Sequence, residues 1–504
     1  MEAIPISPAA SGPGARFPGL AIRGLLLLSV CFVAGFFVWM VSQRLTYPFE
    51  LEWMEGAMAD HVARVLEGRL IYTEPSYEHV AYLYHPGFFY VAALFGKITT
   101  FGYALASLRI TSVVATLLTC WFLFRLVRRD GTWVGGLVAV GVYFASYFLA
   151  GCYYDTGRID PLFACLLLGG IDQMRAARSW KGLVLAGVWF LFAWLTKQTA
   201  ALILPVVVLG SLPGGFRRGA GFGVAVAAAC GLTVWGLDLL HDGWLSYFTL
   251  ELPRNHGFES YLLPLFWSHD LPPMLIGLGL FVVFVLRGSD RRAVVFHASW
   301  IVACFLGGVM SRLHEGGAEN VLIPTIAAVA AASGLGVSTL GVAGLAGRCW
   351  GEGLAVLQLA ILFFLPFLPT KEPYAIPMLP SAQSTERSER LLDELREAAG
   401  PVFLPWHGYL SRMAGKPATA HIMAMDDVWR SGNRRAIEAM DSSIRERFAT
   451  APYPVIYVSN TNPRFLKLVE AGGYRMGRDL QSEFEFRHPV GAPFFPRVSM
   501  VKGP

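Results

Sequence analysis

The sequence has little charge, and its most hydrophilic part has no cysteine. Only 15% of the 504 residues are charged and 54% are hydrophobic, whereas ordinary soluble proteins are about 25% charged. This composition excludes an ordinary soluble domain and indicates a membrane protein. All seven cysteines precede residue 350 and none forms a Cys-x-x-Cys pair. Neither a disulfide framework nor a cysteine metal site is therefore expected in the C-terminal part.

Long apolar runs fill most of the chain up to residue 369. A bilayer crossing needs about 20 mostly apolar residues, and eleven segments meet this need: 21–42, 107–126, 133–152, 159–174, 183–197, 199–213, 220–240, 272–287, 296–311, 319–339 and 353–369. The first run is longer than the apolar part of a signal peptide, so it is interpreted as an uncleaved anchor. The shorter run 86–103, interrupted by Lys97, predicts an interfacial or re-entrant helix.

Positive clusters between the spans indicate the orientation. All of these clusters fall on the same side of the membrane as the N-terminus if residues 86–103 do not cross the membrane. The clusters are Arg125/Arg128/Arg129, Arg175/Arg178/Lys181, Arg217/Arg218, Arg287/Arg291/Arg292 and Arg348. Because Lys and Arg favour the cytoplasmic side, residues 1–20 are predicted to be cytoplasmic. Residues 21–369 then form the membrane module, with 43–106 as its first outer loop.

Residues 370–504 have a different composition. They hold 33 of the 77 charged residues, and short apolar runs (PVFLPW, YPVIYVS) alternate with two amphipathic helical patterns. In the second pattern an apolar stripe recurs at helical spacing, namely Ile437, Met440, Ile444 and Phe448. A small α/β domain outside the cytoplasm is therefore expected.

The first outer loop is rich in acids. Its stretch FELEWMEGAMADHVARVLEGRLIY, residues 49–72, contains Glu50, Glu52, Glu55, Asp60 and Glu67. Apolar residues recur at helical spacing opposite these acids, which predicts an amphipathic helix lying on the membrane surface. On the simplest interpretation, Asp60 and Glu67 belong to the solvated face of that helix.

Other outer ends of spans also carry polar and ionisable residues. They are Asp155, Arg158, Asp160, Lys197, Arg254, His256, Arg312, His314, Glu315 and Asn320. Separate explanations exist, because Lys197 could extend to the membrane surface and Asp155 could pair locally with Arg158. Ionisable groups at membrane depth usually face one another or a cavity. The gathering of these groups at one boundary therefore favours a single polar cavity.

Several motifs resemble those of one enzyme family, both in their order along the chain and in the side of the membrane on which they are predicted to lie. They are the acids before an amphipathic helix, then EGRLIY, YLYHPGFFYVAALFGKI, RIDPLF, LTKQTAALILP and GGAENVLIP. Over about residues 20–370 the chain resembles the GT-C superfamily of integral-membrane glycosyltransferases. The family 39-like branch is most similar; it includes protein O-mannosyltransferases and the aminoarabinose transferase of lipid A. That family often has an Asp-Glu pair where this chain has Met54 and Glu55, and Glu52 is the substitute candidate for the missing Asp.

The resemblance implies a GT-C-like fold of about eleven transmembrane helices and an inverting transfer. The donor would be a polyprenyl-phosphate sugar, and the acceptor a glycan, lipid or protein outside the cytoplasm. The catalytic candidates are Glu55, Glu52, Asp155 and Asp160, with the choice of base between Glu55 and Glu52 open. Lys197, with Arg254 or Arg312, would hold the leaving phosphate. The remaining substrate-binding candidates are Arg158, His256, His314, Glu315, Asn320 and His85.

No cofactor or metal is required by this mechanism, and no nucleic-acid partner is expected. A divalent ion between Glu55 and Asp155 or Asp160 is the alternative. The absence of a Gly-rich phosphate loop fits a lipid-linked donor.

Two other classes of protein function remain open: a lipid-linked oligosaccharide flippase or transporter, and a non-catalytic envelope-assembly protein. Transporters usually contain repeats and broken helices, which this sequence does not show. The expected location is a multi-pass position in a bacterial inner membrane.

Overall fold

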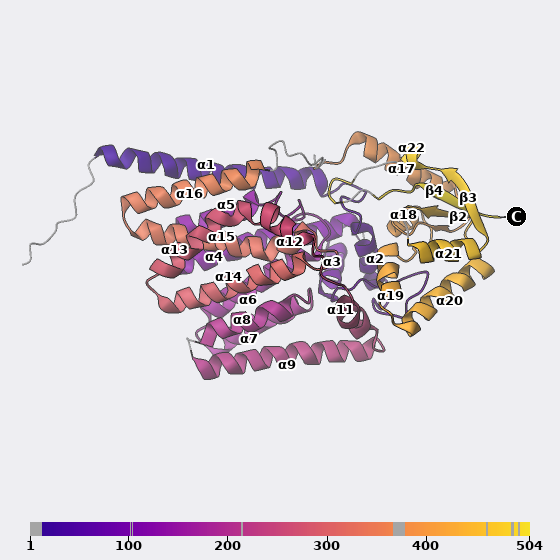
Figure 1. Ribbon diagram of the computed structural model, residues 1–504, viewed down its shortest axis with the longest axis horizontal. Helices are drawn as coiled ribbons and strands as arrows, with labels where there is room; N and C mark the ends of the chain where they lie inside the picture. The colour runs from indigo at the N-terminus through magenta and orange to yellow at the C-terminus, as the bar shows by residue number, and fades with distance from the viewer. Residues whose placement is uncertain are drawn as a thin grey trace, which may run out of the picture.

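The protein consists of a helical bundle followed by a C-terminal α/β domain at one end of its long axis (Figure 1). The computed structural model describes residues 13–100, 102, 104–212, 215–365, 378–459, 462–484, 488–491 and 494–503. The helices of the bundle and its outer loops are α1 (Pro13–Arg44), α2 (Glu55–Leu66), α3 (Gly87–Ile98), α4 (Leu105–Asp130), α5 (Trp133–Ala145), α6 (Ile159–Ala176), α7 (Trp180–Trp194), α8 (Ala200–Ser211), α9 (Phe216–Leu240), α10 (Trp244–Ser246), α11 (Leu252–Arg254), α12 (Leu262–Leu265), α13 (Leu275–Arg287), α14 (Arg291–Arg312), α15 (Ile323–Val342) and α16 (Leu345–Phe364). Short π-helical and 3₁₀ turns connect some of them, at Tyr247–Glu251, Phe266–Asp270, Pro272–Met274 and Glu319–Leu322.

Each of the eleven predicted spans overlaps a helix of the bundle, and residues 213 and 366–369 of two of these spans lie outside the described part of the chain. Among the described residues, seven helices are long and apolar enough to cross a membrane, and α5, α7 and α8 are shorter apolar helices. The expected short helix within 86–103 is α3, which is also apolar. Residues 101 and 103 lie outside the part of the chain that the structure describes. The protein is therefore a multi-pass membrane protein.

The centre of the bundle is α15, which is nearly completely buried. It packs against α5, α13, α14 and α16. A Cβ atom on Gly135 would lie 2.4 Å from the carbonyl oxygen of Gly334, and a Cβ on Gly334 would lie 2.3 Å from that of Gly135. Only glycine allows two helix backbones to approach this closely, so this pair fixes the contact between α5 and α15.

Ion pairs gather at the end of the bundle opposite the C-terminal domain. Arg129 contacts Asp172 at 3.1 Å, and Arg175 contacts Asp130 at 2.7 Å. His297 contacts the other oxygen of Asp130 at 2.8 Å. These pairs connect α4, α6 and α14. The predicted basic connections 125–129 and 175–181 therefore begin at one end of the bundle (Figure 1).

The C-terminal domain contains a four-stranded sheet within the described residues. Its elements are α17 (Ala382–Glu397), β1 (Val402–Phe403), α18 (Gly408–Met413), α19 (Ile422–Arg430), α20 (Arg434–Thr450), β2 (Val455–Val458), α21 (Pro463–Ala471), β3 (Tyr474–Asp479), α22 (Gln481–Phe484) and β4 (Val498–Lys502). The strand order is β1-β2-β4-β3, with β1 parallel to β2 and the other two pairs antiparallel. On α20, Met440, Ile444 and Phe448 of the predicted stripe are buried. The expected α/β domain is confirmed, and its predicted boundary at 370 lies outside the described residues.

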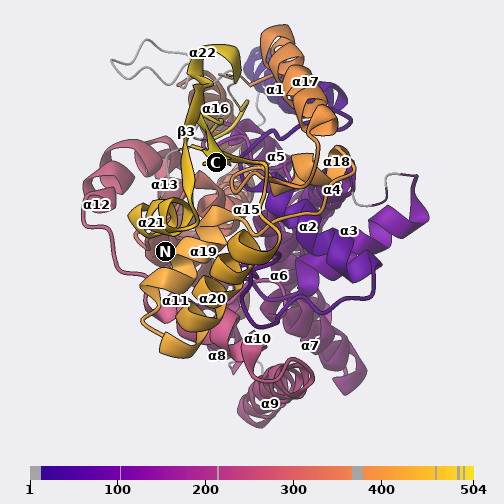
Figure 2. The ribbon, with the colours of Figure 1, turned by 90° about the vertical axis from the view of Figure 1, so that its right-hand side faces the viewer.

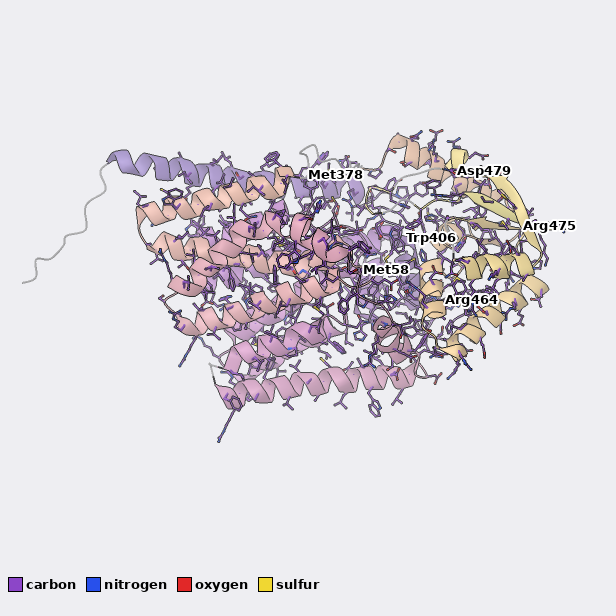
Figure 3. All side chains as sticks on the ribbon, viewed as in Figure 1. Met58, Met378, Trp406, Arg464, Arg475 and Asp479 are labelled. Atoms are coloured by element: carbon purple, nitrogen blue, oxygen red, sulfur yellow. The ribbon has the colours of Figure 1, made fainter. Side chains whose placement is uncertain are left out.

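Helix α2, which was expected on the membrane surface, lies between the bundle and the C-terminal domain (Figures 1 and 2). Its contact with α18 is close, since a Cβ on Gly56 would lie 2.2 Å from Tyr409. Met58 and Trp406 both lie near this boundary (Figure 3). Most of α2 is buried, so the helix has no freely solvated face.

Candidate functional site

Glu55, the first candidate for the base, is fully buried and surrounded by hydrogen-bond donors. Its Oε2 accepts from Arg109 Nη2 at 2.7 Å and from the backbone N–H of Leu51 at 2.7 Å. Its Oε1 accepts from Arg109 Nε at 3.1 Å and from the backbone N–H of Gly157 at 2.7 Å. Burial alone would raise the pKa of Glu55, but Arg109 and the other donors outweigh burial and lower this pKa. This geometry suits a carboxylate that fixes structure.

Arg109 extends the same arrangement to the end of α1. Its guanidinium donates to the carbonyl oxygens of Arg44, Tyr47 and Phe49 at 3.0, 2.5 and 2.6 Å. The first outer loop is thereby held in place on α4. The pair Glu55–Arg109 thus positions the residues that lie between α1 and α2.

Glu52 has far fewer partners. Its Oε2 accepts from the backbone N–H of Met54 at 3.1 Å and from Arg158 Nη1 at 3.4 Å. Among the described residues no donor reaches its Oε1. The same Arg158 nitrogen also contacts Met54 Sδ. Burial raises the pKa of Glu52 to about 7, although Arg158 opposes this shift.

Asp160, Lys197 and Asn320 come together from three distant parts of the chain. Lys197 Nζ contacts Asp160 Oδ1, and Asn320 Nδ2 donates to Asp160 Oδ2 at 2.5 Å. All three side chains are buried. Lys197 therefore pairs inside the protein, and its extension to the membrane surface is not observed. Of the ten outer residues that were predicted to share one polar cavity, this group brings three together.

Tyr84 lies within electrostatic range of Arg158, Asp160 and Glu52, and burial raises the pKa of its phenol to about 12. The neighbouring candidate, His85, is fully buried and donates from Nδ1 to the carbonyl oxygen of Trp194 at 2.7 Å. His85 is thus bonded to Trp194 at the end of α7, and Trp194 precedes Lys197 by three residues. We name Glu52, Arg158, Asp160, Lys197, Asn320, Tyr84 and His85 the polar centre.

Three buried polar atoms around the polar centre have no hydrogen-bond partner among the described residues. They are Asn320 Oδ1, His85 Nε2 and Tyr82 Oη. Tyr82 lies within electrostatic range of Glu52 and Arg158. Buried polar groups in proteins are nearly always hydrogen-bonded, so these atoms are candidates for contacts with a bound substrate.

Asp155 is engaged in a separate pair. Its Oδ1 accepts from Tyr147 at 2.9 Å, and its Oδ2 lies 3.4 Å from Arg44 Nε. The local pair between Asp155 and Arg158 does not form, because Arg158 turns toward Glu52. Both Glu55 oxygens already accept from N–H donors, so Glu55 has little remaining capacity for the alternative ion shared with Asp155 or Asp160.

Arg312 and Arg254 do not join the polar centre directly. Arg312 pairs with Asp270 at 2.8 Å and with Glu319 at 3.0 Å. Arg254 is exposed on α11. Of the three cations considered for the phosphate, only Lys197 lies in the polar centre.

The other outer-loop candidates face the C-terminal domain. His256 Nε2 lies 3.0 Å from Asp427 Oδ1, and Glu315 pairs with Arg430, both on α19. His314 stacks obliquely on His256, with ring centroids 5.5 Å apart. These three residues therefore connect the outer loops to the C-terminal domain.

A further group of titratable residues was absent from the sequence-based candidates. Glu50, His407 and His488 are all buried, and their ligand atoms lie within 4.8 Å of one another. Burial raises the pKa of Glu50 to about 8 and lowers that of His407 to about 4. The group joins the first outer loop to two loops of the C-terminal domain.

Comparisons with known proteins bear on this arrangement of bundle, outer loop and C-terminal domain. The family model described as dolichyl-phosphate-mannose-protein mannosyltransferase matches residues 84–220. ArnT from Cupriavidus metallidurans bound to undecaprenyl phosphate is similar in structure, with a TM-score of 0.59, 14% identity, and coverage of 95% of this chain and 99% of that chain. The GT-C-like fold expected from the sequence is confirmed.

A second structure with this fold comes from an archaeon. The oligosaccharyltransferase AglB from Archaeoglobus fulgidus, in complex with an inhibitory peptide and a dolichol-phosphate, has a TM-score of 0.52 and 11% identity. The match covers 93% of this chain and 70% of that chain. A search of curated protein sequences found no significant match. At these identities the structural likeness establishes the fold alone.

Proposed function

We propose that this protein is an inverting membrane glycosyltransferase. It transfers a sugar from a polyprenyl-phosphate donor to a glycan, lipid or protein acceptor outside the cytoplasm. Three findings support this: the match to the mannosyltransferase family model, the shared fold with ArnT and AglB, and the polar centre beside the first outer loop. ArnT was solved with undecaprenyl phosphate and AglB with dolichol-phosphate, which supports a lipid-linked donor.

The observation that carries the proposal is the position of Glu52. The family that the sequence resembles often has an Asp where this chain has Met54, and Arg158 Nη1 contacts both Met54 Sδ and Glu52 Oε2. The Glu52 carboxylate and the side chain at position 54 thus contact the same guanidinium, that of Arg158. Because its Oε1 accepts from none of the described residues, Glu52 has an oxygen available for the acceptor hydroxyl proton.

Each of the other groups then has a simple role. Glu55 positions the loop through Arg109 and does not take the proton. Lys197, held by Asp160, supplies positive charge for the leaving phosphate. Asn320, which also binds Asp160, presents its Oδ1 atom to the sugar. The acceptor hydroxyl loses its proton to Glu52 as its oxygen attacks the anomeric carbon, and the bond to the phosphate oxygen breaks.

Transfer by the purified chain in lipid nanodiscs tests the proposal. Undecaprenyl phosphates carrying different radiolabelled sugars are incubated with membrane extract from cells that lack the protein. We expect labelled acceptor and released undecaprenyl phosphate, with the anomeric configuration of the transferred sugar inverted. A chain that moves the intact donor across proteoliposome membranes without breaking the sugar–phosphate bond would instead be a carrier.

A further inference from the structure

Glu50, His407 and His488 converge from three segments that are far apart in the sequence. Glu50 precedes α2, His407 precedes α18, and His488 follows α22. His407 Nδ1 lies 2.6 Å from Glu50 Oε2, and His488 Nε2 lies 3.4 Å from the same oxygen. No residue of this group is more than 4% exposed, so the charges and protons at this point must be balanced within the protein.

The surroundings of His407 determine which ring nitrogen carries the proton. His407 Nε2 lies 3.0 Å from the carbonyl oxygen of Phe494. A carbonyl oxygen only accepts hydrogen bonds, so Nε2 carries the N–H and Nδ1 faces Glu50 Oε2. At 2.6 Å these two atoms require a proton or a metal ion between them. Ligating histidines in metal sites typically donate their second ring N–H to a backbone carbonyl in this way.

A shared proton would satisfy Glu50 and His407 alone, but a second imidazole reaches the same oxygen. We propose that Glu50, His407 and His488 bind a Zn²⁺ ion. One carboxylate and two imidazoles are ligands that zinc prefers, with a fourth tetrahedral position left for water. Tetrahedral ligands about 2.0–2.1 Å from zinc lie roughly 3.3 Å apart. The contact from Glu50 to His488 already has that spacing, and the contact from Glu50 to His407 must widen by less than 1 Å.

The position of the site gives the ion a structural role. It joins the first outer loop to the C-terminal domain next to two further contacts. The backbone N–H of Glu50 donates to Tyr409 Oη at 3.2 Å, and the N–H of Val490 donates to the carbonyl oxygen of Leu51 at 2.9 Å. An ion held here fixes the C-terminal domain on the loop that contains Glu52. The site does not depend on the proposed transfer reaction.

Zinc content of the full-length protein tests the site directly. The chain is purified without a polyhistidine tag, passed through metal-free detergent buffer, and analysed by mass spectrometry for metals. We expect about one zinc per chain, since structural zinc binds tightly at neutral pH. Glu50→Gln and His488→Gln should lower zinc content to near zero. His421→Gln, a matched change of another buried histidine in the same domain, should retain the ion.

A second measurement uses only the wild-type chain, so it does not rely on the folding of variants. Zinc is removed with a chelator and then ZnCl₂ or MgCl₂ is added during thermal unfolding. Because the ion would bind the folded state alone, ZnCl₂ should restore a higher Tm and MgCl₂ should not. A folded wild-type chain that contains no zinc and whose Tm does not respond to ZnCl₂ would overturn the proposal. Glu50 and the imidazoles would then share protons only.

Discussion

Arg109 and Glu55 form an ion pair that solvent does not reach, with Arg109 Nη2 2.7 Å from Glu55 Oε2. Two backbone N–H groups, of Leu51 and Gly157, donate to the same carboxylate. A carboxylate with four donors has little remaining capacity to accept a proton from a substrate. In the proposed mechanism Glu55 therefore has a structural role, and Glu52 takes the proton.

Glu55→Gln should destabilise the protein, because Arg109 would remain buried without an anion. Breaking one partner of a buried pair costs about 3–5 kcal/mol, so a clear fall in Tm and in yield is expected. Glu67→Gln is the control, since the pair of Glu67 with Arg412 is partly exposed and such pairs contribute about 0–1 kcal/mol. If Glu55→Gln kept the wild-type Tm and lost only turnover, Glu55 would be the base.

Lys197→Met should weaken the binding of undecaprenyl phosphate. The substitution keeps the apolar part of the side chain and removes the charge beside Asp160. Microscale thermophoresis with undecaprenyl phosphate in nanodiscs measures the effect. Lys97→Met, on the exposed face of α3, is the matched control and should leave Kd unchanged. Equal Kd values for the two variants would exclude Lys197 from the phosphate site.

Gly56→Ala should loosen the C-terminal domain from α2. A Cβ atom there would lie 2.2 Å from both Glu50 Oε1 and Tyr409 Cδ1, so either the helix or the domain must move. Limited proteolysis should release the C-terminal domain faster than in the wild type. Gly35→Ala, where no atom lies within 4 Å of the added carbon, should behave as wild type. Identical cleavage rates for both variants would contradict the packing of α2 against α18.

The C-terminal domain should lie outside the cytoplasm. Chain direction reverses at each span of the bundle, and basic connections lie at the end opposite the C-terminal domain (Figure 1). Lys and Arg favour the cytoplasmic side. Alkaline phosphatase fused after residue 504 should be active, and green fluorescent protein fused there should be dark. The opposite pair of results would place the polar centre on the wrong side for the proposed donor.

Much of the fold could be predicted from local patterns. Apolar runs of sufficient length predicted the helices of the bundle. The apolar stripe of Met440, Ile444 and Phe448 predicted α20, because burial of one helix face imposes a helical period on the sequence. The position of Lys197 and Asn320 at the same end of the bundle was also predicted, from span length. Their contact with Asp160 was expected only as part of a general polar region.

The remaining features depend on contacts that leave no local pattern. Glu50 and His407 are 357 positions apart, and no ligand spacing connects them. Amphipathicity predicted that α2 lies at a boundary, but could not show that a second domain covers its polar face. Likewise, the burial of Glu55 depends on Arg109 in α4. In the sequence, nothing distinguishes Arg109 from other cations near the ends of the predicted spans. The proposed choice of Glu52 over Glu55 therefore rests on the three-dimensional structure.

The turnover of Glu52→Gln tests the central claim most directly. The variant keeps the shape and hydrogen bonding of the side chain while removing its basicity. It is assayed in nanodiscs with labelled undecaprenyl-phosphate sugar and acceptor extract, beside wild type and Asp60→Asn. The account predicts that kcat of the folded variant falls by about 10²–10⁴-fold, whereas Asp60→Asn retains turnover. Near-normal kcat in Glu52→Gln would contradict the assignment of Glu52 as the base.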